Sequence, residues 1–142
     1  PMDLQGAIGR VQLEKFESIH QLRRDNKSEI GAVLEAQIEG LRVPGELDGA
    51  HTSWFGVPVV CRDRSLKEAL VAHLEENRIQ TRNYFSGNIL RHPAYSDLGD
   101  PAEYPNAEQV LDRTFFLGCS PTISPQMIEH IRRVVTNFQY QG

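Results

Sequence analysis

The amino-acid sequence predicts an α/β fold, a two-layer sandwich in which helices pack on a small sheet. Its 142 residues are enough for one domain that buries a core of its own. Hydrophobic residues make up 39% of the chain and charged residues 24%, a balance typical of globular proteins. Segments with helical periodicity alternate with short runs of β-forming residues, which is the order expected when helices cover a sheet.

A long helical segment opens the chain. Apolar side chains share one broad helical face in two successive patterns, separated by the sequence RRDNKS. They are Leu4, Ile8, Val11, Phe16, Ile19 and Leu22 in the first pattern and Ile30, Val33, Leu34, Ile38 and Leu41 in the second. The patterns fit either one long helix or two in series, lying partly outside the sandwich. Pro44 and Gly45 end the segment.

Residues 53–61, SWFGVPVVC, predict the first strand because β-branched and aromatic residues dominate them. Pro58 has no backbone N–H to donate to a neighbouring strand, so we expect it at a sheet edge or a strand end. Trp54 and Phe55 are adjacent, so on a strand their side chains point to opposite faces. Either one packs in the core while the other faces a site, or both pack beneath helices.

Helices and strands alternate through the rest of the chain. We expect a helix at 65–77, a strand at 78–85, a loop at 96–105, a helix at 107–114, a strand at 115–119 and a last helix from 125. Ser65 with Glu68 makes a capping box for the first of these helices, and Asn106 and Ser124 cap the other two. The inward side chains are Leu66, Leu70 and Leu74, and then Ile128, Ile131, Val135 and Phe138.

Charge and motifs exclude several classes of function. A net charge of −4 and a pI near 5.7 argue against a bulk nucleic-acid binder. No membrane span and no secretion signal is expected, and Cys61 and Cys119 are interpreted as buried free thiols, which fits a cytoplasmic protein. The five histidines lack metal-ligand spacing. With no phosphate-binding glycine loop or nucleophile elbow either, we expect no metal site and no catalytic residue here.

Residues 81–95, TRNYFSGNILRHPAY, follow neither a helical nor a strand period. Arg82 stands at a strand end, where its guanidinium offers a forked grip to a carboxylate or phosphate. Asn88 can form hydrogen bonds with hydroxyl or carbonyl groups, and the ring of Phe85 can pack against a flat or sugar-like group. Arg91 adds positive charge. On composition alone, a ligand pocket and a polar loop whose arginines pair with the acidic sequence SDLGDPAE carry equal weight.

Five blocks in order resemble the C-terminal part of the DegT/DnrJ/EryC1/StrS sugar aminotransferase family. They are MDLQGAIGRVQLEKF, SWFGVPV, EALVAHLEEN, IQTRNYFSGNILRHPAY and RTFFLGCSPTISPQMIEHI, and together they span nearly the whole chain. The branch of NDP-4-keto-6-deoxyhexose 3-dehydrases is the most similar. Phe55 follows the tryptophan where aminotransferases typically have histidine, and the pattern TR..F.GN..R.P.Y is the dehydrase-like form.

The resemblance implies the small C-terminal domain of a fold-type I enzyme that uses pyridoxal phosphate or pyridoxamine phosphate. Residues 1–43 would be a linking helical segment and residues 44–142 the small domain, with the cofactor-binding large domain absent. The start within a helix, without methionine, agrees with a fragment. We therefore expect no cofactor bound to this fragment and no activity from it alone, and a homodimer for the full-length protein.

By the same resemblance, Phe55 and Phe85 would wall the cofactor–substrate region. Arg82 and Asn88 would hold substrate or the carboxylate of an amino donor, and Arg91 the nucleotide phosphates or a subunit interface. The predicted function is C-3 dehydration of an NDP-4-keto-6-deoxyhexose in deoxysugar, O-antigen or secondary-metabolite synthesis. The alternatives are a sugar aminotransferase and a free-standing, non-catalytic domain for oligomerisation or ligand binding.

Overall fold

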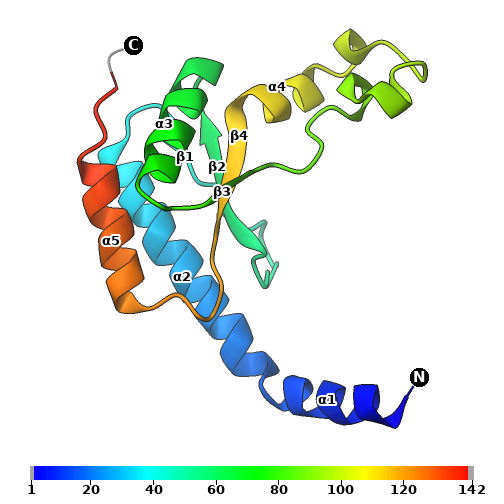
Figure 1. Ribbon diagram of the computed structural model, residues 1–142, viewed down its shortest axis with the longest axis vertical. Coiled ribbons are helices and arrows are strands. Elements are labelled where there is room, and N and C mark those ends of the chain that lie inside the picture. The colour runs from blue at the N-terminus through cyan, green and yellow to red at the C-terminus, as the bar shows by residue number, and fades with distance from the viewer. Residues whose placement is uncertain (1, 141–142) are drawn as a thin grey trace.

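Figure 1 shows the computed structural model of the chain, which describes residues 2–140. The helices and strands follow one another as α1 (Asp3–Glu14), α2 (Phe16–Gln37), β1 (Leu41–Arg42), β2 (Gly56–Cys61), α3 (Arg64–Glu76), β3 (Thr81–Asn83), α4 (Pro105–Arg113), β4 (Thr114–Gly118) and α5 (Pro125–Thr136). Three short 3-10 helices, η1 (Ile89–Arg91), η2 (Pro93–Tyr95) and η3 (Pro101–Glu103), lie between β3 and α4.

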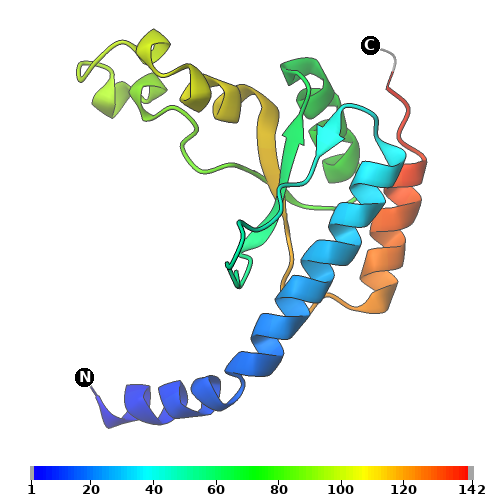
Figure 2. The ribbon, with the colours of Figure 1, turned by 180° about the vertical axis from the view of Figure 1, so that it is seen from behind.

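The strands form one antiparallel sheet in the order β1-β2-β4-β3. One face of the sheet is buried through Val57, Val59, Cys61, Phe115 and Leu117, which join apolar residues of α2, α3 and α5 in a single core. In both Figure 1 and Figure 2, α2 and α5 lie side by side in this helical layer. The predicted α/β class, with helices packed on a small sheet, is confirmed.

The opposite face of the sheet carries no helix over its centre. Pro58, Phe116 and Arg82 are register partners on three adjacent strands, so their side chains share this face. We call it the open face.

The N-terminal segment is two helices that meet at Lys15, which caps the end of α1 and the start of α2. The backbone there opens to φ −90° and ψ −3° without any glycine or proline to signal the break. The sequence RRDNKS, which separates the two apolar patterns, lies inside α2. The apolar patterns therefore predicted helix correctly but placed the division about ten residues too late.

Helix α1 buries none of its residues, whereas α2 places Ile30 and Leu34 at the centre of the core. In Figure 2, α1 extends away from the body beyond the end of α2. The expectation that the segment lies partly outside the sandwich is confirmed. The core runs across the expected boundary at residues 43 and 44, because Val43 and Val57 belong to one cluster.

Two of the predicted helix starts need correction. Helix α3 is capped by Asp63, whose carboxylate accepts the Leu66 N–H at 2.8 Å, and not by Ser65. Helix α4 begins at Pro105 with Tyr104 in the cap position, two residues before the predicted cap Asn106. A third prediction is confirmed, since the Ser124 hydroxyl accepts the Met127 N–H at the start of α5.

The strands are shorter than the sequence suggests. The helical pattern was extended to Leu41, yet α2 ends at Gln37 and Leu41 starts strand β1. β2 is therefore an interior strand at Val60 and Cys61. Pro58 lies inside β2, so the expected strand-end position is wrong, but the expected edge position holds locally. At Pro58 itself only β4 is a partner, because β1 pairs with Val60 and Cys61 alone.

Both cysteines are buried and free, as expected. Across residues 2–140, no helix combines the length and apolar character needed to cross a membrane. No group of three or more histidine, cysteine or acidic residues in that range gathers to hold a metal ion.

Candidate functional site

Four aromatic side chains gather on the open face around a cavity of about 210 Å³, here called the aromatic pocket. The lining residues are Phe55, Tyr84, Phe85 and Phe116, with Thr52, Trp54, Gly56 and Pro58. The ring centroids of Phe55 and Phe116 are 5.6 Å apart, and those of Phe85 and Phe116 are 5.9 Å apart. These spacings are typical of mutually packed aromatic rings, so the walls support one another.

Gly56 allows this close packing. A Cβ at this position would meet the Phe116 ring at 2.5 Å and the Leu117 carbonyl at 2.7 Å. Because Gly56 has no side chain, the Phe116 ring can lie against strand β2. In the sequence SWFGV, this glycine directly follows Phe55, which forms another wall of the pocket.

Trp54 and Phe55 both line the pocket, but they differ in how far they are buried. Trp54 is half-buried against the core, while Phe55 is 69% exposed beside Phe85 and Phe116. Phe55 is not packed beneath a helix, whereas Trp54 packs on the core and also lines the pocket, so neither of the two alternatives that the sequence left open holds in full.

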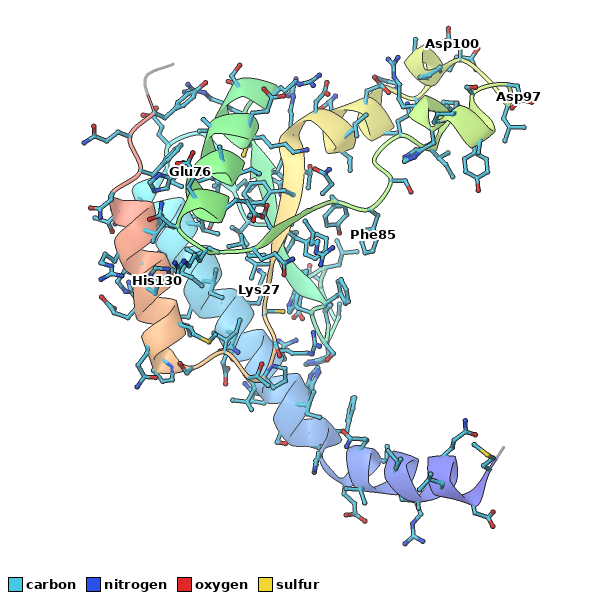
Figure 3. All side chains as sticks on the ribbon, in the orientation of Figure 1. Lys27, Glu76, Phe85, Asp97, Asp100 and His130 are labelled. Carbon is cyan, nitrogen blue, oxygen red and sulfur yellow. The ribbon has the colours of Figure 1, made fainter. Side chains whose placement is uncertain are left out.

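Phe85 has an unusual backbone. Its φ of 52° lies in the left-handed region, which is uncommon for a bulky residue, and its ring is 70% exposed. The chain reverses tightly here, since the Phe85 N–H donates to the Asn83 carbonyl at 2.7 Å. Figure 3 shows Phe85 where β3 turns into the projecting segment. Strain of this kind is kept only where the surroundings enforce it, and it concentrates at functional sites.

Arg82 reaches the open face beside the aromatic pocket without lining it. It pairs with Phe116 across β3 and β4 and is exposed. Within residues 2–140, its side chain makes no hydrogen bond or ion pair. Its guanidinium is therefore free to bind a ligand next to the pocket. Its predicted role in binding substrate requires this, and that role stays a prediction.

Residues 84–104 form a segment here called the arm. Two of its residues, Asn88 and Arg91, form hydrogen bonds with other parts of the chain. The Asn88 amide nitrogen donates to the Pro101 carbonyl at 3.1 Å and to Glu108 Oε1 at 2.6 Å, and its amide oxygen accepts the Leu90 N–H. Arg91 binds the same carboxylate in a fork, with Nη2 2.8 Å from Glu108 Oε2. Together they close the arm onto α4.

This arrangement bears on the predicted roles of both residues. Asn88 is only 2% exposed, and hydrogen bonds inside the chain occupy its amide. Its predicted contact with substrate therefore stays a prediction that this conformation does not support. Arg91 forms an ion pair with an acidic residue, as the polar-loop alternative predicted. Its partner is Glu108 on α4, however, and not a residue of the sequence SDLGDPAE. Hydrogen bonds from Arg91, and next from Asn88, lower the pKa of Glu108 against the opposing effect of burial.

The aromatic pocket suits an uncharged, ring-shaped group and does not suit a pyridoxal phosphate cofactor by itself. None of the described residues that line it is charged, so it offers no lysine for a covalent link and no cation for a phosphate. Two of the three lysines of the chain are otherwise engaged: Lys67 donates to the Leu111 carbonyl at 2.6 Å and Lys27 lies over the Trp54 ring. The lining of this pocket thus offers one wall of a site and no charged group for the cofactor.

Several residues of the site were not singled out from the sequence. Phe116 was interpreted as part of a buried strand, but strand alternation sends Phe115 to the core and Phe116 to the open face. The available signal was that neighbouring residues of a strand point to opposite faces, so Phe115 and Phe116 could not both face the core. Arg23, Arg24 and Glu46, which hold the loop before β2, gave no signal, because their partners are distant in sequence.

This fold, a small antiparallel sheet with helices packed on one face, is shared with solved structures of aminotransferases. The chain belongs to the DegT/DnrJ/EryC1/StrS aminotransferase family, whose model matches residues 2–139. Solved structures agree. DesV of S. venezuelae superposes with a TM-score of 0.81 at 20% identity, over 93% of this chain and 35% of its own.

Curated relatives, among them a sugar 3-dehydratase, are similar to this chain in sequence. The lipopolysaccharide biosynthesis protein RfbH of Salmonella typhimurium is 31% identical over 96% of this chain, and the dTDP-4-dehydro-2,6-dideoxy-D-glucose 3-dehydratase of Saccharopolyspora spinosa is 34% identical over 96%. The GDP-4-keto-6-deoxy-D-mannose-3-dehydratase of E. coli, solved with bound hydrated PLP, superposes with a TM-score of 0.75 at 25% identity. The chain spans about a third of the length of these relatives.

Proposed function

We propose that this chain is the C-terminal domain of a vitamin-B6-dependent sugar-nucleotide 3-dehydratase. The proposed reaction is C-3 dehydration of an NDP-4-keto-6-deoxyhexose in deoxysugar or lipopolysaccharide synthesis. Support comes from the relatives, which are named as dehydratases of such sugars or as a lipopolysaccharide biosynthesis protein.

The observation that carries the proposal is the aromatic pocket with Phe55 in its wall. An uncharged pocket of stacked rings suits the apolar face of a deoxyhexose, whose C–H groups pack well on aromatic surfaces. A histidine in place of Phe55 would bring a titratable group into this pocket. Phe55 instead gives this part of the wall no titratable or hydrogen-bonding side-chain group.

Arg82 is the proposed anchor for a charged group of the substrate or amino donor. It lies on the open face next to Phe116, where an exposed guanidinium can form two parallel hydrogen bonds with a carboxylate or phosphate. We place Arg91 in a supporting role, since its fork to Glu108 holds the arm.

Pyridoxal or pyridoxamine phosphate would act as the electron sink, held by the part of a full-length protein that this chain does not include. We further propose a cytoplasmic homodimer. The apolar face of α1, exposed at Leu4, Ile8 and Val11, is a surface that such an enzyme would cover.

The test uses the full-length protein, loaded with pyridoxamine phosphate and given an NDP-4-keto-6-deoxyhexose. A dehydratase releases a product that has lost the 3-hydroxyl, whereas an aminotransferase gives an amino sugar, and mass spectrometry separates the two. We expect Arg82→Met to raise KM about tenfold or more without unfolding the protein. Arg132→Met, on α5, is the matched control. An amino-sugar product would contradict the proposal, and unchanged kinetics of Arg82→Met would remove Arg82 from the site.

A further inference from the structure

The loop between β1 and β2 brings three residues to the aromatic pocket, namely Thr52, Trp54 and Phe55. It has no regular secondary structure, so helix and sheet hydrogen bonds do not hold it. A loop of this kind would ordinarily sample several conformations, and a ligand would have to select the one in which Phe55 faces Phe116. The contacts below show what holds it instead.

Arg24 of α2 and Glu46 of the loop hold Thr52 at both of its backbone groups. Arg24 forms a fork with the Glu46 carboxylate, with Nη2 3.0 Å from Oε2, and its Nη1 also donates to the Thr52 carbonyl at 3.2 Å. The Thr52 N–H donates to Glu46 Oε1 at 2.7 Å. The three residues therefore form a closed ring of hydrogen bonds, and the side chains of Arg24 and Glu46 are only 27% and 20% exposed.

Arg23, the preceding residue on α2, holds the next part of the loop. Its Nη1 donates to the Trp54 carbonyl at 2.7 Å and to the Phe55 carbonyl at 3.3 Å. The Cys119 thiol donates to the same Trp54 carbonyl, and the Lys27 ammonium lies 4.6 Å from the centre of the Trp54 ring. Figure 3 shows Lys27 on α2, the helix from which both arginines come.

We propose that Arg23, Arg24 and Glu46 are positioning residues that fix Phe55 in the pocket wall before any ligand arrives. They do not line the pocket, and they act through the backbone of Thr52, Trp54 and Phe55. The conformational entropy of this loop is then lost during folding. Ligand binding therefore does not include the free-energy cost of ordering it. What the wall binds rests on the proposed function, but the positioning itself does not.

Trp54 is the single tryptophan of the chain, so its fluorescence reports the state of this loop directly. In the 142-residue chain without ligand, we expect Arg24→Met and Arg23→Met each to raise the acrylamide quenching constant of Trp54 by about twofold through local opening. Arg24→Lys keeps the charge but loses the fork, so it should give an intermediate value.

Arg64→Met is the matched control, because it removes an ion-paired arginine from α3, at Glu68 and Asp112, without touching the loop. Circular dichroism establishes that each variant is folded. If Arg24→Met is unfolded, the quenching constants of Arg24→Lys and Arg23→Met test the proposal instead. Quenching constants equal to that of Arg64→Met in the folded variants would overturn the proposal.

The second readout is kinetic and uses the full-length protein. Arg24→Met should raise KM for the sugar nucleotide about tenfold while kcat changes less, since a wall that is no longer preordered weakens ground-state and transition-state binding alike. A full-length protein with no dehydratase activity would contradict the proposed function alone, because the fluorescence result stands without it. A larger fall in kcat than in 1/KM would contradict the positioning role.

Discussion

At the scale of single residues, Phe85 combines an exposed ring with a left-handed backbone. Its φ of 52° is strained for a residue with a Cβ, and its ring touches Phe55 and Phe116 rather than the core. Folding gains little from placing a phenylalanine here. The residue is better explained by the pocket that it walls.

The paired variants Phe85→Ala and Phe85→Gly separate strain from ring contacts. Both remove the ring, but only glycine adopts the left-handed backbone without a Cβ clash. We expect Phe85→Gly to be more stable than Phe85→Ala by about 1 kcal/mol in urea unfolding. Equal stability of the two variants would show that the backbone at residue 85 is not strained. In the full-length protein, both should weaken sugar-nucleotide binding to a similar degree.

At the scale of elements, the arm is held to the body by few contacts. Figure 3 shows Asp97 and Asp100 near its far end, well away from the sheet. Asn88 is its main internal support, since its one amide bonds to residues in η1, η3 and α4. Gly87, with φ 59°, lies so close to α4 that a Cβ would meet Leu111 at 2.7 Å. The base of the arm is therefore closely packed, while its outer part depends on polar contacts.

Asn88→Ala should loosen the arm and leave the body intact. The substitution removes the acceptor of the Leu90 N–H and one donor each from the Pro101 carbonyl and Glu108, so local opening of the arm becomes easier. Hydrogen exchange followed by mass spectrometry should show faster exchange for peptides in 88–104 and unchanged exchange for α5. Asn137→Ala, after the end of α5, is the control. Uniformly faster exchange across the chain would mean that Asn88 supports the whole fold instead.

At the scale of the whole molecule, one core unites α2, the sheet, α3 and α5, while α1 and the arm project from it (Figure 1). Several carboxylates accept hydrogen bonds that stabilise the loops and helix ends around this core. Hydrogen bonds from Arg24 and then from the Thr52 backbone lower the pKa of Glu46 from 4.5 to about 2. Backbone hydrogen bonds lower the pKa values of Asp63 and Glu75, and the Arg91 guanidinium lowers that of Glu108.

These shifts predict that the chain loses stability in acid. Each folded-state pKa lies below its unfolded value, so the unfolded chain binds more protons as the pH falls. For Glu46, the stabilisation is complete above pH 4.5 and is lost as the pH falls towards about 2. Urea midpoints measured across this window should fall, and Glu46→Gln should make the fall smaller. Glu14→Gln, on the projecting α1, is the control; an identical slope in both variants would contradict the role of Glu46.

Much of the fold follows from local sequence patterns. Most helix and strand identities, the Ser124 cap and the inward Ile128, Ile131 and Val135 of α5 depend on near neighbours, and the sequence predicted them correctly. The errors share a cause. The break at Lys15, the strand at Leu41 and the cap at Asp63 depend on how segments meet in space, which periodicity does not encode.

The candidate site divides in the same way. The sequence by itself determined the family, the α/β class and the aromatic character of the pocket segment, because residue type and order carry that information. Only the tertiary structure decided that Asn88 and Arg91 bind Glu108, that Phe116 joins Phe55 and Phe85, and that Arg23 and Arg24 hold the loop. The physical reason is that the partner of a hydrogen bond or a ring is chosen by folding, and here these partners lie between 17 and 61 residues apart.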